Sequence, residues 1–243
     1  IVVFLCVYIG AGWTIRLQYG ILAVLLLSIL SFTAGAWMDW SPELLRANLS
    51  THWLEGHSFF VVFALFFPAV TGIMAGVNMS GDLKAPDQAI PRGTFAAIGV
   101  SAIIYGGIAL LLAASTSRAE LLGDGFVLKD KAWSGALIYA GVISATLSSA
   151  LGSMMGAPRI LQAFARDNVF KKLKWFAQGS GPSGEPRHAL LLTFLIAHLG
   201  IMAGDLNTIA PIITMFFLLT YGTTNLACFY ESISRNPSFR PTF

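Results

Sequence analysis

Two segments of the sequence combine residue types and spacings that could bind inorganic ions. In the first, Pro68 lies in the middle of an apolar run, and Gly72 and Gly76 follow it. Proline leaves an earlier carbonyl without its helical donor, and glycine relaxes the backbone, so this composition favours a broken helix. Carbonyls before the break could coordinate a cation, and N–H groups after it could hold an anion. Such breaks bind substrates in many secondary transporters, although a simple kink would show the same residues.

The second segment places three oxygen-bearing positions on one face of a predicted helix. Ala145, Ser148 and Ser149 are spaced at i, i+3 and i+4, which brings one carbonyl and two hydroxyls together. Three uncharged, hard oxygens suit Na⁺. A packing stripe of small residues is the alternative interpretation, and Gly141 and the glycines that follow it favour that alternative.

The composition places both segments inside a membrane protein. Apolar residues make up 56% of the 243 residues, charged residues make up 11%, and the net charge is +3. A soluble chain usually carries about 25% charged residues. These values exclude a disordered chain, a nucleic-acid-binding module and a disulfide scaffold, and Cys6 and Cys228 offer no metal or redox spacing. An enzyme is not expected, because the sequence contains no CxxC or HExxH pattern and no nucleophile triad.

Long runs without charged residues predict helices that cross a bilayer, since a span needs about 20 apolar residues. The runs are too long and too uniformly apolar for barrel strands, so the sequence predicts an all-α transmembrane fold. We expect a single partial transmembrane domain over 1–243, in which 231–243 begins a following cytoplasmic loop. The predicted spans cover about 1–15, 17–38, 58–79, 94–117, 133–158, 189–204 and 206–230.

The positive charges are distributed unequally between the two predicted sides of the membrane. Of the 15 Lys and Arg residues, eleven lie on one side and four on the other. The positive-inside rule makes the richer side cytoplasmic, including the loops 80–93 and 158–187. In the second loop, Phe170 and Leu173 lie among lysines, which favours a short interfacial helix and a solvated basic loop equally. We expect an integral protein of the plasma membrane or the cell inner membrane.

Several motifs closely resemble the cation-chloride cotransporter family of the amino acid-polyamine-cation superfamily, in its sodium-coupled branch. The longest are FPAVTGIMAGVNMSGDL at 67–83 and SATLSSAL at 144–151, and shorter ones follow at 157–163 and 206–213. The resemblance extends from about Phe59 to the end of the chain. It implies an inverted-repeat, LeuT-like transporter bundle, of which this chain would form a fragment covering about helices four to ten, with a discontinuous helix at about 58–79.

The resemblance also implies ion ligands, transferred position by position. The serine pair favours the sodium-coupled branch, whereas the first and third helices, which supply further ligands in this family, are not in the sequence. The implied ligands are Pro68 and Thr71 for potassium, Gly72, Ile73, Met74 and Tyr221 for chloride, and Ala145, Ser148 and Ser149 for sodium.

The sequence therefore predicts secondary active, electroneutral symport of chloride with sodium, with potassium left open as a third ion. The full apolar runs contain no acidic residue that could neutralise a bound cation. Co-bound chloride can supply this counter-charge instead. One alternative is an amino-acid permease of the same superfamily, in which the amides after Thr71 would hold a substrate carboxylate. A channel or a non-transporting membrane scaffold is a further alternative. The expected partners are inorganic ions, the lipid bilayer and a second copy in a homodimer, without a cofactor or nucleic acid.

Overall fold

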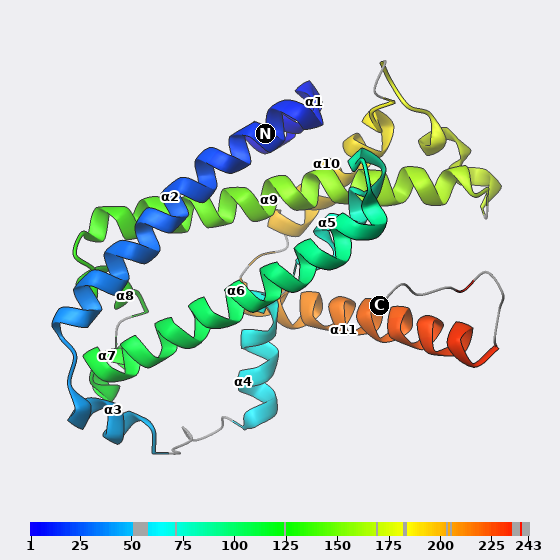
Figure 1. Cartoon of the computed structure of the whole chain (residues 1–243). Coiled ribbons are helices and arrows are strands. Elements are labelled where there is room, and N and C mark those ends of the chain that lie inside the picture. Colours follow the sequence, from blue (N-terminus) through cyan, green and yellow to red (C-terminus); the bar gives the residue numbers. More distant parts are fainter. Residues whose placement is uncertain are drawn as a thin grey trace. The chain divides into compact units, whose positions relative to one another are not determined.

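The computed structural model describes the chain as a set of helices (Figure 1). The described residues are all except 51–57, 71, 124, 169, 182–183, 203, 205, 235–238 and 240–243. Within them the structure contains no β-strand, only an isolated bridge between Ser180 and Glu185. The predicted all-α class is therefore confirmed. The loop predicted at 231–243 begins inside the last helix, and most of its remainder lies outside the described residues.

Four helices in the described part of the chain are long and apolar enough to cross a membrane. They are α2 (Ala11–Met38), α6 (Pro86–Ser115), α9 (Gly135–Arg166) and α11 (Leu206–Ser234). A further apolar helix, α10 (Arg187–Met202), has 16 residues, fewer than the roughly 20 that a straight span needs. The shorter elements outside the predicted break are α1 (Val2–Ile9), α3 (Pro42–Asn48), α7 (Arg118–Gly123), α8 (Leu128–Lys131) and the 3-10 helix η3 (Lys171–Ala177).

The observed helix boundaries differ from the predicted spans where the sequence changes from apolar to charged. The boundary predicted near Arg16 lies instead at Gly10, whose φ of 141° is rarely adopted by other residues, and α2 runs through Arg16. Similarly, α9 continues past Pro158 to Arg166 instead of ending at 158. A single arginine does not end a helix because it is a good helix former. A helical proline removes one backbone hydrogen bond and crowds an earlier carbonyl, but membrane helices tolerate it where neighbouring groups satisfy the freed carbonyl.

The run 58–79 is interrupted, and the sequence predicts a discontinuous helix here. It contains α4 (Phe59–Phe66), the 3-10 turn η1 (Phe67–Val70) and α5 (Ala75–Asn78). Gly72 has a φ of 104°, which is accessible to glycine and strained for residues with a Cβ atom. Pro68 lies in η1, so the proline and the glycine both lie between the end of α4 at Phe66 and the start of α5 at Ala75. A second 3-10 turn, η2 (Ser80–Asp82), follows α5.

The chain forms two compact units. The first contains Ile1–His52 and Gly72–Ala197, and the second contains Trp53–Thr71 and His198–Phe243. In the second unit α4 and η1 pack against α11, where the Thr214 hydroxyl donates to the carbonyl of Ala64 at 3.0 Å. A membrane helix gains stability from such bonds because lipid offers its polar groups no partner.

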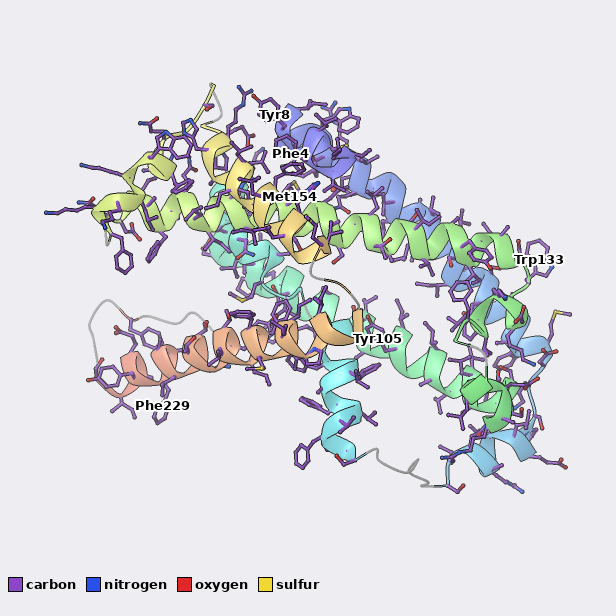
Figure 2. The ribbon with its side chains drawn as sticks, turned by 180° about the vertical axis from the view of Figure 1, so that it is seen from behind. Phe4, Tyr8, Tyr105, Trp133, Met154 and Phe229 are labelled. Atoms are coloured by element: carbon purple, nitrogen blue, oxygen red, sulfur yellow. The ribbon has the colours of Figure 1, made fainter. Side chains whose placement is uncertain are left out.

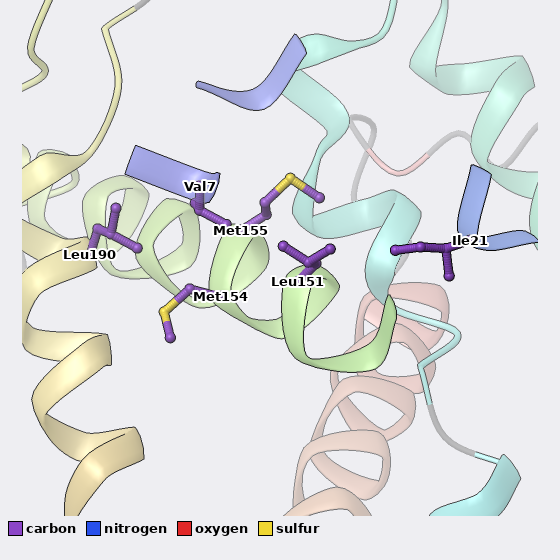
Figure 3. Packing of buried hydrophobic residues seen from close by; sticks show 6 residues of the cluster. All are labelled: Val7, Ile21, Leu151, Met154, Met155 and Leu190. Atoms are coloured by element: carbon purple, nitrogen blue, oxygen red, sulfur yellow. The ribbon is translucent and has the colours of Figure 1, made fainter. Parts of the chain in front are cut away.

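Packing of α2 along α9 organises the first unit (Figure 1). Helices α1, α5 and α8 and the 3-10 helix η3 also contact α9, and α3 packs on α6. The main buried cluster joins side chains from α1, α2, α9 and α10 (Figure 3). It consists of Val7, Ile21, Leu151, Met154, Met155 and Leu190.

Large apolar side chains cover much of the protein's outer surface. Figure 2 shows Trp133 and Phe229 projecting away from the ribbon, and they are 75% and 63% exposed. Tyr105 on α6 is exposed as well. Water would disfavour so much exposed apolar area, whereas a lipid bilayer solvates it. The surface is that of an integral membrane protein.

Substitution of Gly35 tests the contact between α2 and the segment preceding α9. A Cβ atom at Gly35 would collide with the backbone carbonyl of Lys131 and the backbone nitrogen of Trp133. Because backbone atoms cannot swing aside, we expect Gly35→Ala to destabilise the intact protein by about 1–3 kcal/mol. Thermal unfolding in detergent measures the effect. Gly20→Ala is the matched control, since nothing lies within 4 Å of an added Cβ there. Equal melting temperatures for the two variants would contradict this packing.

Candidate ion-binding sites

Two of the predicted sodium positions, Ala145 and Ser148, lie on the side of α9 that faces α2. A cavity of about 350 Å³ lies between the two helices, and Ala145 and Ser148 contribute its α9 wall. Ser149 is the next residue along α9 and is exposed. The structure therefore brings two of the three predicted sodium positions to one cavity. The α2 wall consists of Ile15, Gln18, Tyr19, Ile21, Leu22 and Leu25.

Gln18 is the polar side chain that sequence reasoning missed. Its Nε2 donates to the backbone carbonyl of Ser148 at 3.2 Å, and its Oε1 accepts from the Ser148 hydroxyl at 2.6 Å. Glutamine is uncharged, so Gln18 does not interrupt an apolar run when only charged residues are counted. A signal was present nonetheless, because a side-chain amide inside a membrane span needs a partner on a neighbouring helix.

The packing interpretation of the α9 face holds at other positions of the same face. A Cβ atom at Gly141 would collide with the Ser28 side chain of α2, and one at Gly156 would lie 3.1 Å from Nδ2 of Asn78 in α5. By contrast, nothing lies within 4 Å of a Cβ added at Gly152. Close helix packing therefore brackets the serine pair, and the cavity lies between the tightly packed positions.

The predicted chloride amides lie in the turn between η1 and α5. Gly72 accepts a hydrogen bond from the Ala75 amide at 3.0 Å, and Met74 accepts one from the Asn78 amide at 2.9 Å. Met74 is the N-terminal cap of α5, so Gly72, Ile73 and Met74 precede this helix, and chloride binding at their amides stays a prediction. Helix α5 has only four residues, however, so its dipole is smaller than that of the half-helix the sequence suggests. The amides themselves are then the main source of positive potential.

The predicted potassium positions are the least defined. The backbone of Pro68 forms part of η1. Thr71 lies outside the described residues. Potassium ligation at these two positions therefore stays a prediction.

Tyr221 presents a buried polar atom without a partner among the described residues. Its hydroxyl is shielded from solvent and has no hydrogen-bond partner within the described part of the chain. The ring stacks on Phe217 of the same helix, with centroids 5.5 Å apart and an interplanar angle of 25°. A buried, unpaired hydroxyl is unfavourable, so a ligand that accepts a hydrogen bond from it would be stabilised there. An anion such as chloride is a ligand of this kind.

The candidate sites are built from neutral groups. Among the described residues, no cluster of three or more His, Cys, Asp or Glu side chains could hold a metal ion. The available ligands are hydroxyls, amides and carbonyls, which suit alkali cations and halide anions.

The helices define an integral membrane protein, and comparison with known proteins gives its class. The family model described as amino acid permease matches residues 1–243, so the chain belongs to the amino acid permease family. This is a family of transporters and not of enzymes.

Similar proteins belong to one group of solute carriers, which confirms the resemblance to the cation-chloride cotransporters. The chain is 36% identical to human solute carrier family 12 member 1 in a gapped alignment of 283 positions, which covers 96% of the chain and 26% of that relative. It is 39% identical to mouse solute carrier family 12 member 8 over 234 residues, covering 93% and 33%. It is 36% identical to human solute carrier family 12 member 2 over 282 residues, covering 96% and 23%. The chain thus spans about a quarter to a third of these relatives.

Proposed function

We propose that the intact protein carries out secondary active symport of chloride with sodium. The observation that carries the proposal is the cavity in which Ala145 and Ser148 face the amide of Gln18. It offers a cation neutral oxygens without a carboxylate. The similarity to solute carrier family 12 members supports ion cotransport as the class of activity.

The proposed symport is electroneutral for a physical reason. A cation held only by neutral oxygens inside a bilayer leaves a net charge that is expensive to bury. A chloride bound at the amides of Gly72, Ile73 and Met74 would compensate this charge. Potassium is the candidate third ion, at Pro68 and Thr71, and its transport would require a second chloride to keep the cycle electroneutral.

Tracer chloride uptake by the intact protein in proteoliposomes tests the proposal. We expect uptake that saturates with external chloride and depends on external sodium, without a change in membrane potential. Uptake that only follows the chloride gradient and ignores sodium would indicate a channel. Absence of uptake would indicate a non-transporting scaffold.

An amino-acid permease is the second candidate function. The matching family is named for amino acid permeases, and backbone amides at a helix break bind a carboxylate as readily as a halide. In this case uptake of labelled amino acids should saturate, and free amino acids should compete for the amides of Gly72, Ile73 and Met74. Sodium-dependent chloride uptake that amino acids leave unchanged would exclude this candidate.

The charge distribution predicts the orientation of the chain in the membrane. With Cys6 and Cys228 replaced by serine, a cysteine at Ser50 should react with an impermeant thiol reagent added outside intact cells. A cysteine at Ser180, in the basic loop 158–187, should react only after the cells are opened. Labelling in the reverse pattern would show that the cytoplasmic and external sides are exchanged.

A further inference from the structure

The hydrogen bonds between Gln18 and Ser148 define the orientation of both side chains. The Ser148 carbonyl can only accept, so the amide nitrogen of Gln18 must face it, at 3.2 Å. The amide oxygen of Gln18 is then directed at the Ser148 hydroxyl, at 2.6 Å. Because an amide oxygen cannot donate, the hydroxyl proton must point toward α2.

Several other hydroxyls on the helices donate within their own helix, although Ser31 of α2 donates to the Ser134 carbonyl at 3.2 Å and Thr214 also donates to the Ala64 carbonyl. Ser and Thr side chains inside helices commonly donate to the carbonyl four residues earlier. Thr33, Thr146, Thr193, Thr214 and Thr220 all do so here, with distances between 2.8 and 3.0 Å. Ser148 instead donates to a residue 130 positions away on α2. The hydrogen bond to Gln18 therefore orients the Ser148 hydroxyl toward the partner helix.

This orientation of the Ser148 hydroxyl has a consequence for cation binding. A serine hydroxyl carries one proton and two acceptor lone pairs. With its proton held by Gln18, the Ser148 oxygen keeps both lone pairs for another ligand. Ser148 and Gln18 both line the cavity between α2 and α9, together with Ala145. A cation in this cavity would therefore meet the oxygen of Ser148 and not its hydrogen.

We propose that Gln18 is a positioning residue for the sodium site, which holds the Ser148 hydroxyl with its lone pairs available to the ion. This inference rests on the proposed sodium site. Gln18 acts through Ser148, so its contribution should disappear when the Ser148 hydroxyl is removed. Its effect should fall on sodium affinity and not on the maximal rate of transport.

Chloride uptake by the intact protein in proteoliposomes, measured against external sodium concentration, tests the proposal. In Gln18→Met the side chain keeps a similar length and shape. It can neither accept a hydrogen bond from the Ser148 hydroxyl nor donate one to the Ser148 carbonyl. We expect the half-saturating sodium concentration to rise about threefold to tenfold, as for the loss of an ordinary hydrogen bond, with a maximal rate within about twofold of wild type. Thr146→Val is the matched control, because its hydroxyl donates to carbonyls of its own helix, at 3.0 and 2.9 Å.

The double variant Gln18→Met with Ser148→Ala distinguishes positioning from an independent effect. We expect the double variant to match Ser148→Ala alone, because Gln18 then has no hydroxyl to orient. Fully additive effects of the two substitutions would overturn the role of Gln18 and leave the sodium site intact. The same conclusion would follow if Gln18→Met kept the wild-type sodium dependence while Ser148→Ala raised the half-saturating sodium concentration. Wild-type behaviour of Ser148→Ala would instead overturn the sodium site itself. If Gln18→Met does not yield a monodisperse protein, Gln18→Leu provides the same comparison.

Discussion

Replacing Ser148 or Ser149 with alanine in the intact protein should raise the sodium concentration needed for half-maximal chloride uptake at least several-fold. Each substitution removes one hydroxyl from the few neutral oxygens proposed to bind the ion. A hydrogen bond to a charged partner contributes about 1.5–3 kcal/mol, and loss of an oxygen ligand from a cation should be comparable, near tenfold or more. Uptake of tracer chloride over a range of external sodium concentrations measures the effect.

The two serines should differ in one respect. Ser148→Ala also removes the hydroxyl that donates to Gln18, so it leaves the amide oxygen of Gln18 without that partner. Ser149 is exposed and should have little effect on stability. Thr146→Val serves as control, since Thr146 lies on another face of α9. Unchanged sodium dependence in both serine variants would remove the sodium site.

Tyr221→Phe should weaken the apparent affinity for chloride by about tenfold or more. The Tyr221 hydroxyl is shielded from solvent and has no hydrogen-bond partner among the described residues. A bond from this hydroxyl to a bound anion would contribute roughly 1.5–3 kcal/mol. Phenylalanine cannot make that bond, so the loss should appear as a higher half-saturating chloride concentration in tracer uptake.

The same substitution should leave the fold intact. Phenylalanine keeps the aromatic ring that stacks on Phe217, and the hydroxyl it lacks has no protein partner to lose in the described part of the chain. Thermal stability should therefore be unchanged or slightly higher. Tyr230→Phe, on an exposed position of the same helix, is the control. A chloride curve for Tyr221→Phe that overlays the wild-type curve would remove Tyr221 from the site and favour the permease alternative.

The features that the sequence predicts correctly are local along the chain. Apolar runs without charge predict membrane helices because each residue contacts lipid or a neighbouring helix regardless of its distant partners. The break in the run 58–79 follows from Pro68 and Gly72, whose backbone restrictions act within one or two turns. The spacing of Ala145, Ser148 and Ser149 places them on one face of α9 by helical geometry alone.

Helix boundaries were less predictable because charge marks where lipid ends and not where a helix ends. Helix α2 continues through Arg16, and α9 continues through Pro158, since backbone hydrogen bonds form in the headgroup region as well as in the hydrocarbon core. The short length of α5 likewise depends on how the chain leaves the turn at Gly72.

Only the tertiary structure shows which surfaces meet. Gly35 packs against backbone atoms about a hundred residues away, and Ser148 donates to Gln18, 130 positions away. Periodicity along a helix defines which residues share a face, but it does not specify which face of another helix lies opposite. The partner of a polar side chain depends on that pairing. The sequence therefore does not identify Gln18 as part of the site, whereas the packing of α2 on α9 places its amide against Ser148.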